Sequence, residues 1–349
     1  MGTTPEASRL ASCITSYLQP AIPGPTLEGA IAVVANHELY PKDLAPAVWH
    51  NPAYVQFILR VDFLQSRINE WIAESPEGQA NYPMILTRIF TLLGKQASRN
   101  LVACIRLNRI LGVIPRKPGD RMPLLPKDQL KHAIAAEEFC LNKSFAFSEM
   151  AFLGGLHFDL LIASFTRAKA SRDALGAFPT QWVESLRTAH FAYEIGSRLK
   201  SFKWNDTVFA AGLAIGIGKI LMTAQFPKEM GAGSWPGFLA ECEKLKVGRW
   251  VHFELQEKTR FDTTHAELAS LAASFWRFLA PVELAIRYYQ TPYYLKTAKP
   301  DQYTVSAILC VSHALAVGAP LGELHQRVLR NLGLTAAAVQ EIKTKVLSK

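Results

Sequence analysis

The chain has 349 residues, of which 49% are hydrophobic and 19% are charged. This composition supplies enough apolar side chains for one large or two average domains, and it excludes a chain that is disordered throughout. Lys and Arg number 38 against 29 Asp and Glu, a net charge of +9, but the basic residues are spread out. The charge is compatible with an anionic partner and does not by itself predict nucleic-acid binding.

The dominant sequence period is that of an α-helix. Apolar residues recur at spacings of three and four over residues 54–72, 85–93 and 268–279, and Thr264 precedes the last of these segments as a predicted N-cap. Sustained alternation of β-branched and polar residues, the pattern of a half-buried strand, is missing. We therefore predict an all-α fold, a multi-helix bundle.

A proline-rich segment divides the helical pattern. Residues 113–127, VIPRKPGDRMPLLPK, contain four prolines, which is typical of a boundary between helical units. We therefore predict an N-terminal helical unit over residues 1–115, a proline-rich loop over 116–127 and a larger helical domain over 128–349.

Two further breaks lie inside the larger domain. The segment 227–237, PKEMGAGSWPG, is predicted to be a surface loop. Its Trp235 stands between glycines, so it is our candidate for contact with a partner, although a side chain folded back onto the domain fits the pattern equally well. The segment 291–301 is predicted to separate two core helices.

The cysteines and the N-terminus bear on the cellular compartment. The sequence MGTTPEASRL lacks the basic and apolar regions of a signal peptide. The longest charge-free stretch, 302–322, contains polar residues and a proline, and we interpret it as a core helix rather than a membrane span. The five cysteines never form a CxxC pair, which argues against disulfides and zinc knuckles. We expect a cytoplasmic protein without a metal or other cofactor.

Common catalytic motifs are missing from the sequence. GxSxG, GxxxxGK[ST] and HExxH do not occur. Gly212, Gly216 and Gly218 form GLAIGIG within an apolar helical pattern, where small residues allow helices to approach closely. We therefore interpret these glycines, and Lys219 at their polar edge, as packing residues rather than as a phosphate site.

Six segments follow one another in the order of the motifs of a known helical family. They are LYPKDLAPAVWHNPAYVQFILRVD (39–62), YPMILTRIFTLLGKQASRNLV (82–102), WVESLRTAHFAYEIG (182–196), AGLAIGIGKILM (211–222), THAELASLAASFWRFLAPVELAIRYYQTP (264–292) and LGLTAAAVQEI (332–342). With this set, the chain resembles the HDOD domain proteins, a signalling branch of the HD metal-dependent phosphohydrolases. The resemblance implies an HD-like bundle with an N-terminal helical subdomain, and it leaves an insertion around residues 128–180.

The resemblance also locates the positions at which catalytic HD enzymes hold metal ligands, namely histidines, a His–Asp pair and a late aspartate. These positions carry Glu184, Ile215–Gly216, His265, Tyr288–Tyr289 and His313. Only His265 keeps the family residue, and a hydrolytic centre needs at least three ligands and an open position for water. We therefore expect an inert remnant pocket, formed by Glu184, Lys219, His265, Tyr288, Tyr289 and His313. Its tyrosine rings would fill the former cavity and bond to His265 or His313.

The resemblance implies a non-catalytic signalling or regulatory protein of bacterial type. It would bind a partner protein or an anionic ligand such as a nucleotide, with no nucleic acid and no membrane span expected. The alternative is a metal-dependent phosphohydrolase with a rebuilt ligand set, drawn from His157, Asp159, Glu184, His190, His265 and His313. A nucleic-acid-binding protein would require a basic stripe, which the sequence does not show.

Overall fold

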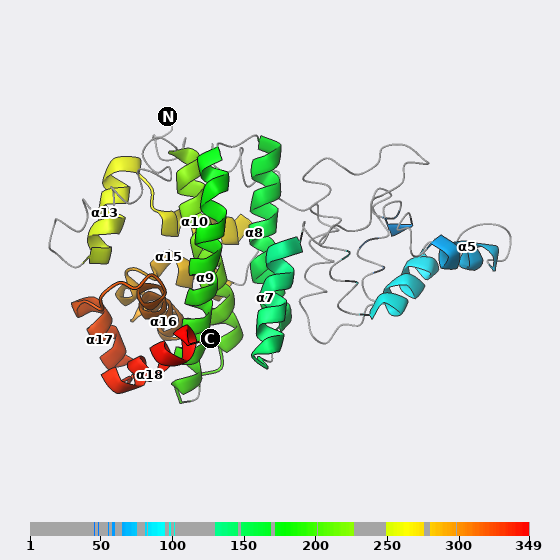
Figure 1. Ribbon diagram of the computed structural model, residues 1–349. Helices are drawn as coiled ribbons and strands as arrows, with labels where there is room; N and C mark the ends of the chain where they lie inside the picture. The colour runs from blue at the N-terminus through cyan, green and yellow to red at the C-terminus, as the bar shows by residue number, and fades with distance from the viewer. Residues whose placement is uncertain are drawn as a thin grey trace. The chain divides into compact units, whose positions relative to one another are not determined.

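The described part of the protein consists of helices and the short segments that join them. The computed structural model describes residues 45, 48, 55, 58–59, 65–74, 81, 83–94, 98, 101, 130–145, 148–168, 172–200, 202–226, 249–275, 280–297 and 299–348. These ranges contain helices and turns and no β-strand, which confirms the predicted all-α fold (Figure 1). The chain divides into two compact units, one of residues 21–131 and one of residues 1–20 with 132–349. The proline-rich segment 113–127 lies outside the described residues, so the predicted domain limits stay a prediction.

In the unit of residues 21–131, the described helices are α5 (Gln65–Ala73) and the apolar helix Pro83–Gly94. The second helix buries Ile85, Ile89 and Phe90 on one face, as its three- and four-residue spacing predicts.

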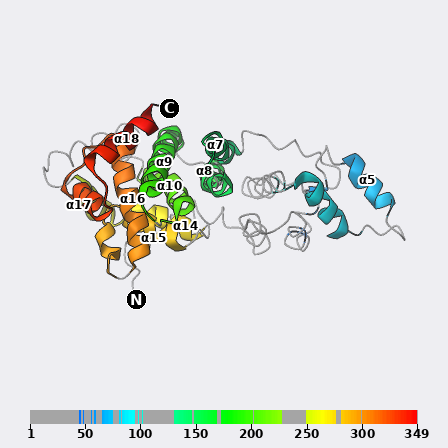
Figure 2. The same ribbon diagram turned by 90° about the horizontal axis from the view of Figure 1, so that it is seen from below.

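The second unit holds the longer helices. Its elements are α7 (Lys131–Asn142), α8 (Ser148–Ala168), α9 (Arg172–Arg198), α10 (Asn205–Gln225), α13 (Arg249–Phe261), α14 (His265–Phe275), α15 (Ala280–Tyr288), the 3-10 helix η7 (Pro292–Leu295), α16 (Pro300–Ala316), α17 (Glu323–Asn331) and α18 (Ala336–Leu347). In both views, α9 and α10 lie between α7 and α8 on one side and α15 and α16 on the other, and α14 packs against α10 (Figures 1 and 2).

Helix α10 forms the centre of this unit because it is apolar on every side. All its residues from Thr207 to Ala224 are buried. Its glycines allow close approach, as predicted: a Cβ atom at Gly212 would lie 2.6 Å from Cα of Ala189 in α9, and one at Gly218 would collide with the backbone carbonyl of His265 in α14. Small residues on α10 therefore set the spacing of three helices.

Helix α16 is the core helix predicted within residues 302–322, and η7 occupies the predicted break before it. Among the described residues, α10 alone is long and apolar enough to cross a membrane, and its apolar window is fully buried within the protein. Burial of this kind is typical of a central core helix. The predicted loop 227–237, with Trp235, lies outside the described residues.

His325 in α17 gives the fold a dependence on pH. Its side chain is 3% exposed and its Nδ1 finds no hydrogen-bond partner within the described part of the chain. Burial lowers the pKa of His325 from 6.5 to about 4. The unfolded chain therefore binds this proton at a higher pH than the folded chain does, so stability is lost as the pH falls from about 6.5 towards about 4.

Between about pH 7 and about pH 4, we expect the free energy of unfolding of His325→Leu to fall by up to about 3 kcal/mol less than that of the parent protein. The measurement is the free energy of unfolding in urea at about pH 7 and about pH 4 for both proteins. Equal losses in the two proteins would show that His325 is protonated in the folded state.

Candidate functional site

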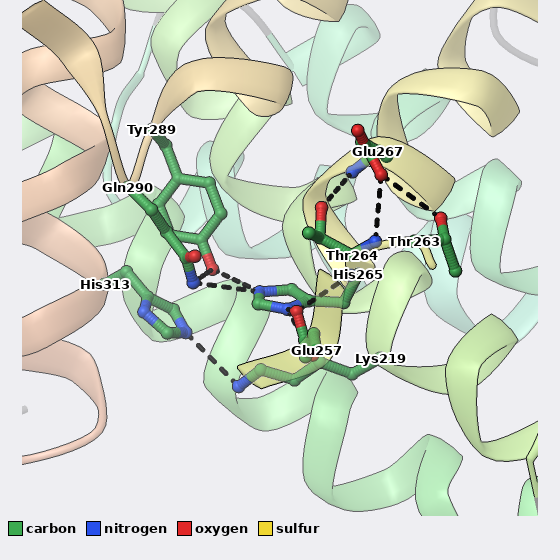
Figure 3. A network of polar contacts seen from close by, with 9 residues as sticks. All are labelled: Lys219, Glu257, Thr263, Thr264, His265, Glu267, Tyr289, Gln290 and His313. Carbon is green, nitrogen blue, oxygen red and sulfur yellow. Dashed lines mark hydrogen bonds and ion pairs between the residues drawn. The ribbon is translucent and has the colours of Figure 1, made fainter. Parts of the chain in front are cut away.

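Five helices of the second unit, together with the turn that follows α15, bring polar side chains to one buried region beside α10. Figure 3 shows most of this region, in which the chains of polar contacts centre on His265 and on Lys219. Glu184 comes from α9, Lys219 from α10 and His313 from α16. The glycine contacts of α10 hold it against α9 and α14, so this close packing fixes the positions of the polar groups on those helices.

The start of α14 places His265. Thr264 is the N-cap that the sequence predicts: its Oγ1 accepts from the Glu267 backbone N–H at 3.0 Å, and the Glu267 carboxyl accepts from the Thr264 N–H at 3.0 Å. This reciprocal pair is a capping box. Because the box fixes the first turn, the side chain of His265 is directed into the bundle (Figure 3).

Both ring nitrogens of His265 are occupied. Nδ1 lies 2.7 Å and 2.8 Å from the two carboxyl oxygens of Glu257, and one of these oxygens also accepts from the His265 backbone N–H at 3.1 Å. On the other side of the ring, Nε2 lies 2.6 Å from the hydroxyl of Tyr289. The side chains of His265 and Glu257 are 0% exposed. The sequence predicts that the hydroxyls of Tyr288 and Tyr289 bond to His265 or His313, and of these contacts the structure has the one between Tyr289 and His265.

The hydrogen-bond directions in this cluster follow from its chemistry. Burial raises the pKa of Tyr289 well above 10, so its hydroxyl keeps its proton. Gln290 Nε2 donates to that hydroxyl at 3.1 Å, which leaves the phenolic proton to be donated to His265 Nε2. His265 then carries its proton on Nδ1, facing Glu257. Neither nitrogen of the histidine remains available as a ligand.

A second set of contacts centres on the ammonium of Lys219. Its Nζ donates to Glu184 Oε2 at 3.0 Å and lies 3.3 Å from His313 Nε2. Burial, and then the positive charge of Lys219, lower the pKa of His313 well below 6.5, so His313 is neutral and its Nε2 accepts from the lysine. The ring of Tyr289 packs edge-on against that of His313 at 5.3 Å, which places the two networks side by side.

This arrangement does not fit a catalytic metal centre. In the ranges that the structure describes, no three His, Cys, Asp or Glu side chains come together as a ligand group. The Lys219 ammonium bridges Glu184 and His313, and a second cation beside it would be repelled. At the positions aligned with the His–Asp pair, Ile215 is buried and Gly216 packs against Ser185.

One of the predicted site residues, Tyr288, lies outside these networks. Tyr288 is half-buried and faces Tyr294 at 6.3 Å and Arg287, away from the His265 network. The side chains of Tyr288 and Tyr289 point to different surroundings because α15 ends at Tyr288 and Tyr289 begins the following turn. Trp235 lies outside the described residues.

Two residues named for a rebuilt metal site, Asp159 and His190, make structural contacts instead. Asp159 in α8 accepts from the backbone N–H groups of His132 and Ala133 and lies 2.8 Å from the His132 ring, so it holds the start of α7. His190 packs among aromatic rings, including that of Phe139 at 5.1 Å, with Glu194 3.7 Å away. Glu257 and Gln290, which complete the His265 network, carry no motif or spacing that could have identified them from the sequence.

The adjacent tyrosines provide a matched test of the network. Tyr289→Phe removes the hydroxyl that bonds His265 and Gln290, and we expect a cost of about 1–3 kcal/mol because buried partners lose a hydrogen bond. Tyr288→Phe is the control and is expected to change stability by less than about 0.5 kcal/mol. Urea unfolding measures both variants. Equal effects would mean that the Tyr289 hydroxyl does not stabilise the fold.

Comparison with known proteins adds a family match. Residues 158–292 match the family model described as the HDOD domain, an interval that contains three of the six segments identified in the sequence, 182–196, 211–222 and 264–292. No curated protein matches the chain significantly.

Several solved structures are similar to the chain at low identity. One is a protein of Shewanella amazonensis SB2B, named provisionally as a phosphohydrolase; it is 16% identical, with a TM-score of 0.42 over 98% of this chain and 94% of that one. A protein of Marinobacter aquaeolei VT8, named provisionally as a signal transduction protein, is 18% identical, with a TM-score of 0.44 over 98% of this chain and 63% of that one. The MmoQ response regulator of Methylococcus capsulatus str. Bath is 16% identical, with a TM-score of 0.36 over 91% of this chain and 95% of that one.

Proposed function

The chain carries an HDOD domain over residues 158–292, and on this premise we propose that it is a non-catalytic regulatory protein of a bacterial signalling pathway. It acts in the cytoplasm by binding a partner protein or an anionic ligand such as a nucleotide. No metal, nucleic acid or membrane span is part of this proposal. The non-catalytic part of the proposal is supported by the described residues, among which no three potential metal ligands come together.

The observation that carries the proposal is the position of Lys219. Its ammonium lies between Glu184 and His313, the two residues aligned with the first and last metal ligands of HD enzymes. The remaining aligned histidine, His265, uses both ring nitrogens in hydrogen bonds. A hydrolytic metal needs deprotonated donors with free lone pairs and an open position for water. These residues instead satisfy one another, so the site favours a structural role over hydrolysis.

Metal content and phosphodiesterase activity test the proposal together. Protein purified without chelator and incubated with Mn²⁺, Fe²⁺ or Zn²⁺ is expected to retain no stoichiometric metal by elemental analysis, and to hydrolyse bis(p-nitrophenyl) phosphate no faster than a buffer blank. Close to one metal per chain, lost in His265→Ala or His313→Ala, would overturn the proposal in favour of a metal-dependent phosphohydrolase.

A further inference from the structure

A cavity of about 730 Å³ lies in the second unit, lined by residues other than those of the His265 and Lys219 networks. It is bounded by the end of α9, the segment between α9 and α10, the first turn of α16, and the segment between α17 and α18. α9 and α18 lie side by side at this end of the bundle (Figure 1). Its volume is within the range of about 300–1,000 Å³ that small-molecule sites occupy.

The lining of this cavity is positively charged. Arg198, Lys200 and Lys203 face it, against a single carboxylate, that of Asp301. Arg198 is already paired with Glu341 at 2.8 Å. No ion pair within the described ranges engages Lys200 or Lys203, and both are exposed. Two lysines therefore retain unneutralised charge at a concave site, which favours an anion.

An aromatic surface lies beside the two lysines. Trp204 lines the cavity with 37% of its surface exposed, although a tryptophan normally gains stability by burial. It is the N-cap residue of α10 but makes no side-chain cap hydrogen bond, so the start of that helix does not require its side chain. An exposed indole next to unpaired ammonium groups is suited to a ligand in which a planar ring, which can stack on the indole, is joined to a negatively charged group, which the ammonium groups can bind.

The opposite wall is held in place by hydrogen bonds. Asn331, the last residue of α17, donates to the hydroxyl of Tyr303 at 2.9 Å and to that of Tyr293 at 3.1 Å. These bonds tie the end of α17 to α16 and η7. A wall fixed before binding lowers the entropy cost of capturing a ligand.

We propose that this cavity binds a nucleotide, with its phosphates on Lys200 and Lys203 and its base stacked on Trp204. The inference deepens the proposed function, on which it rests, by assigning the anionic ligand a chemical class and a place. The phosphate and base chemistry is shared by a free nucleotide and by the end of a nucleic-acid strand. The limited volume of the cavity, about 730 Å³, favours the free nucleotide.

Isothermal titration of the full chain with ADP, GDP, CDP and UDP tests this inference, with pyrophosphate and adenosine as partial ligands. We expect at least one of the four nucleotides to bind, and more tightly than either partial ligand. The double variant Lys200→Ala/Lys203→Ala should weaken that binding by about tenfold or more, because charge-assisted contacts to phosphate are lost, and Lys200→Arg/Lys203→Arg should retain it. Trp204→Ala should weaken it by about fivefold or more, and Trp204→Phe should recover most of the loss.

A matched control is available at the two ends of α7, where Lys131 is its first residue and Lys143 directly follows its last. Lys131→Ala/Lys143→Ala removes the same two charges away from the cavity and should leave binding unchanged. The inference is wrong if none of the four nucleotides binds, if binding is unaffected by Lys200→Ala/Lys203→Ala, or if a short oligonucleotide binds more tightly than every mononucleotide. The metal and phosphodiesterase assays examine the His265 region, so failure there is distinguishable from failure at this cavity.

Discussion

Gly218→Ala is expected to lower the free energy of unfolding by about 3 kcal/mol or more, because the added methyl group has no space. A Cβ atom at this position collides with the backbone carbonyl of His265 and lies 2.9 Å from the Cβ of Ala269. Neither obstacle is the end of a flexible side chain. Accommodation requires α10 and α14 to separate, which disturbs the helix start that positions His265.

A second glycine provides the control for this substitution. Gly176 lies in α9, and a Cβ atom added there meets nothing within 4 Å. Gly176→Ala is therefore expected to stabilise the protein by about 0.5–1 kcal/mol, since alanine restricts the unfolded chain and favours the helix. Urea unfolding followed by circular dichroism gives both values. If Gly218→Ala were as stable as Gly176→Ala, the result would show that α10 and α14 do not approach each other closely at Gly218.

The second large effect is expected at Glu257. Glu257→Ala should cost about 3–5 kcal/mol, because it leaves the backbone N–H and the ring Nδ1–H of His265 without an acceptor in a fully buried setting. Glu257→Gln keeps one acceptor oxygen, so its free energy of unfolding should lie between that of Glu257→Ala and that of the parent protein.

Glu267 is the matched control, since it also accepts a backbone N–H at the start of α14. Its side chain is 26% exposed, so water can replace the lost acceptor and Glu267→Ala is expected to cost about 1 kcal/mol. Thermal and urea unfolding compare the two alanine variants. A cost at Glu257 no larger than that at Glu267 would mean that the His265 network adds nothing beyond helix capping.

The fold was predictable because its signals are local. The period of apolar residues identifies the helix at 83–94, and Thr264 followed by Glu267 identifies the start of α14 through the chemistry of a capping box. The glycines of α10 predict close helix contacts because their spacing falls within an apolar helical pattern, whichever helices they meet.

The site was only partly predictable because its partners are distant in the sequence. Lys219 and His313 are 94 residues apart, and no local pattern specifies their contact. The choice between Tyr288 and Tyr289 depends on where α15 ends, and helix ends follow weakly from sequence. The basic cavity likewise draws on four separate segments, so the charge of any one of them gives no indication of it.

The packing of Gly216 has a consequence for the design of a metal site in this protein. A Cβ atom there collides with Ser185 Oγ and lies 2.9 Å from the Gln181 carbonyl oxygen, both in α9. The resemblance to HD enzymes places an aspartate at this position, and the present gap between α9 and α10 is too narrow for its side chain. Introducing a carboxylate here in one substitution would therefore damage the fold. Changes in α9 would have to come first, so a designed metal site at this position needs a rebuilt neighbouring helix before it can gain its ligand.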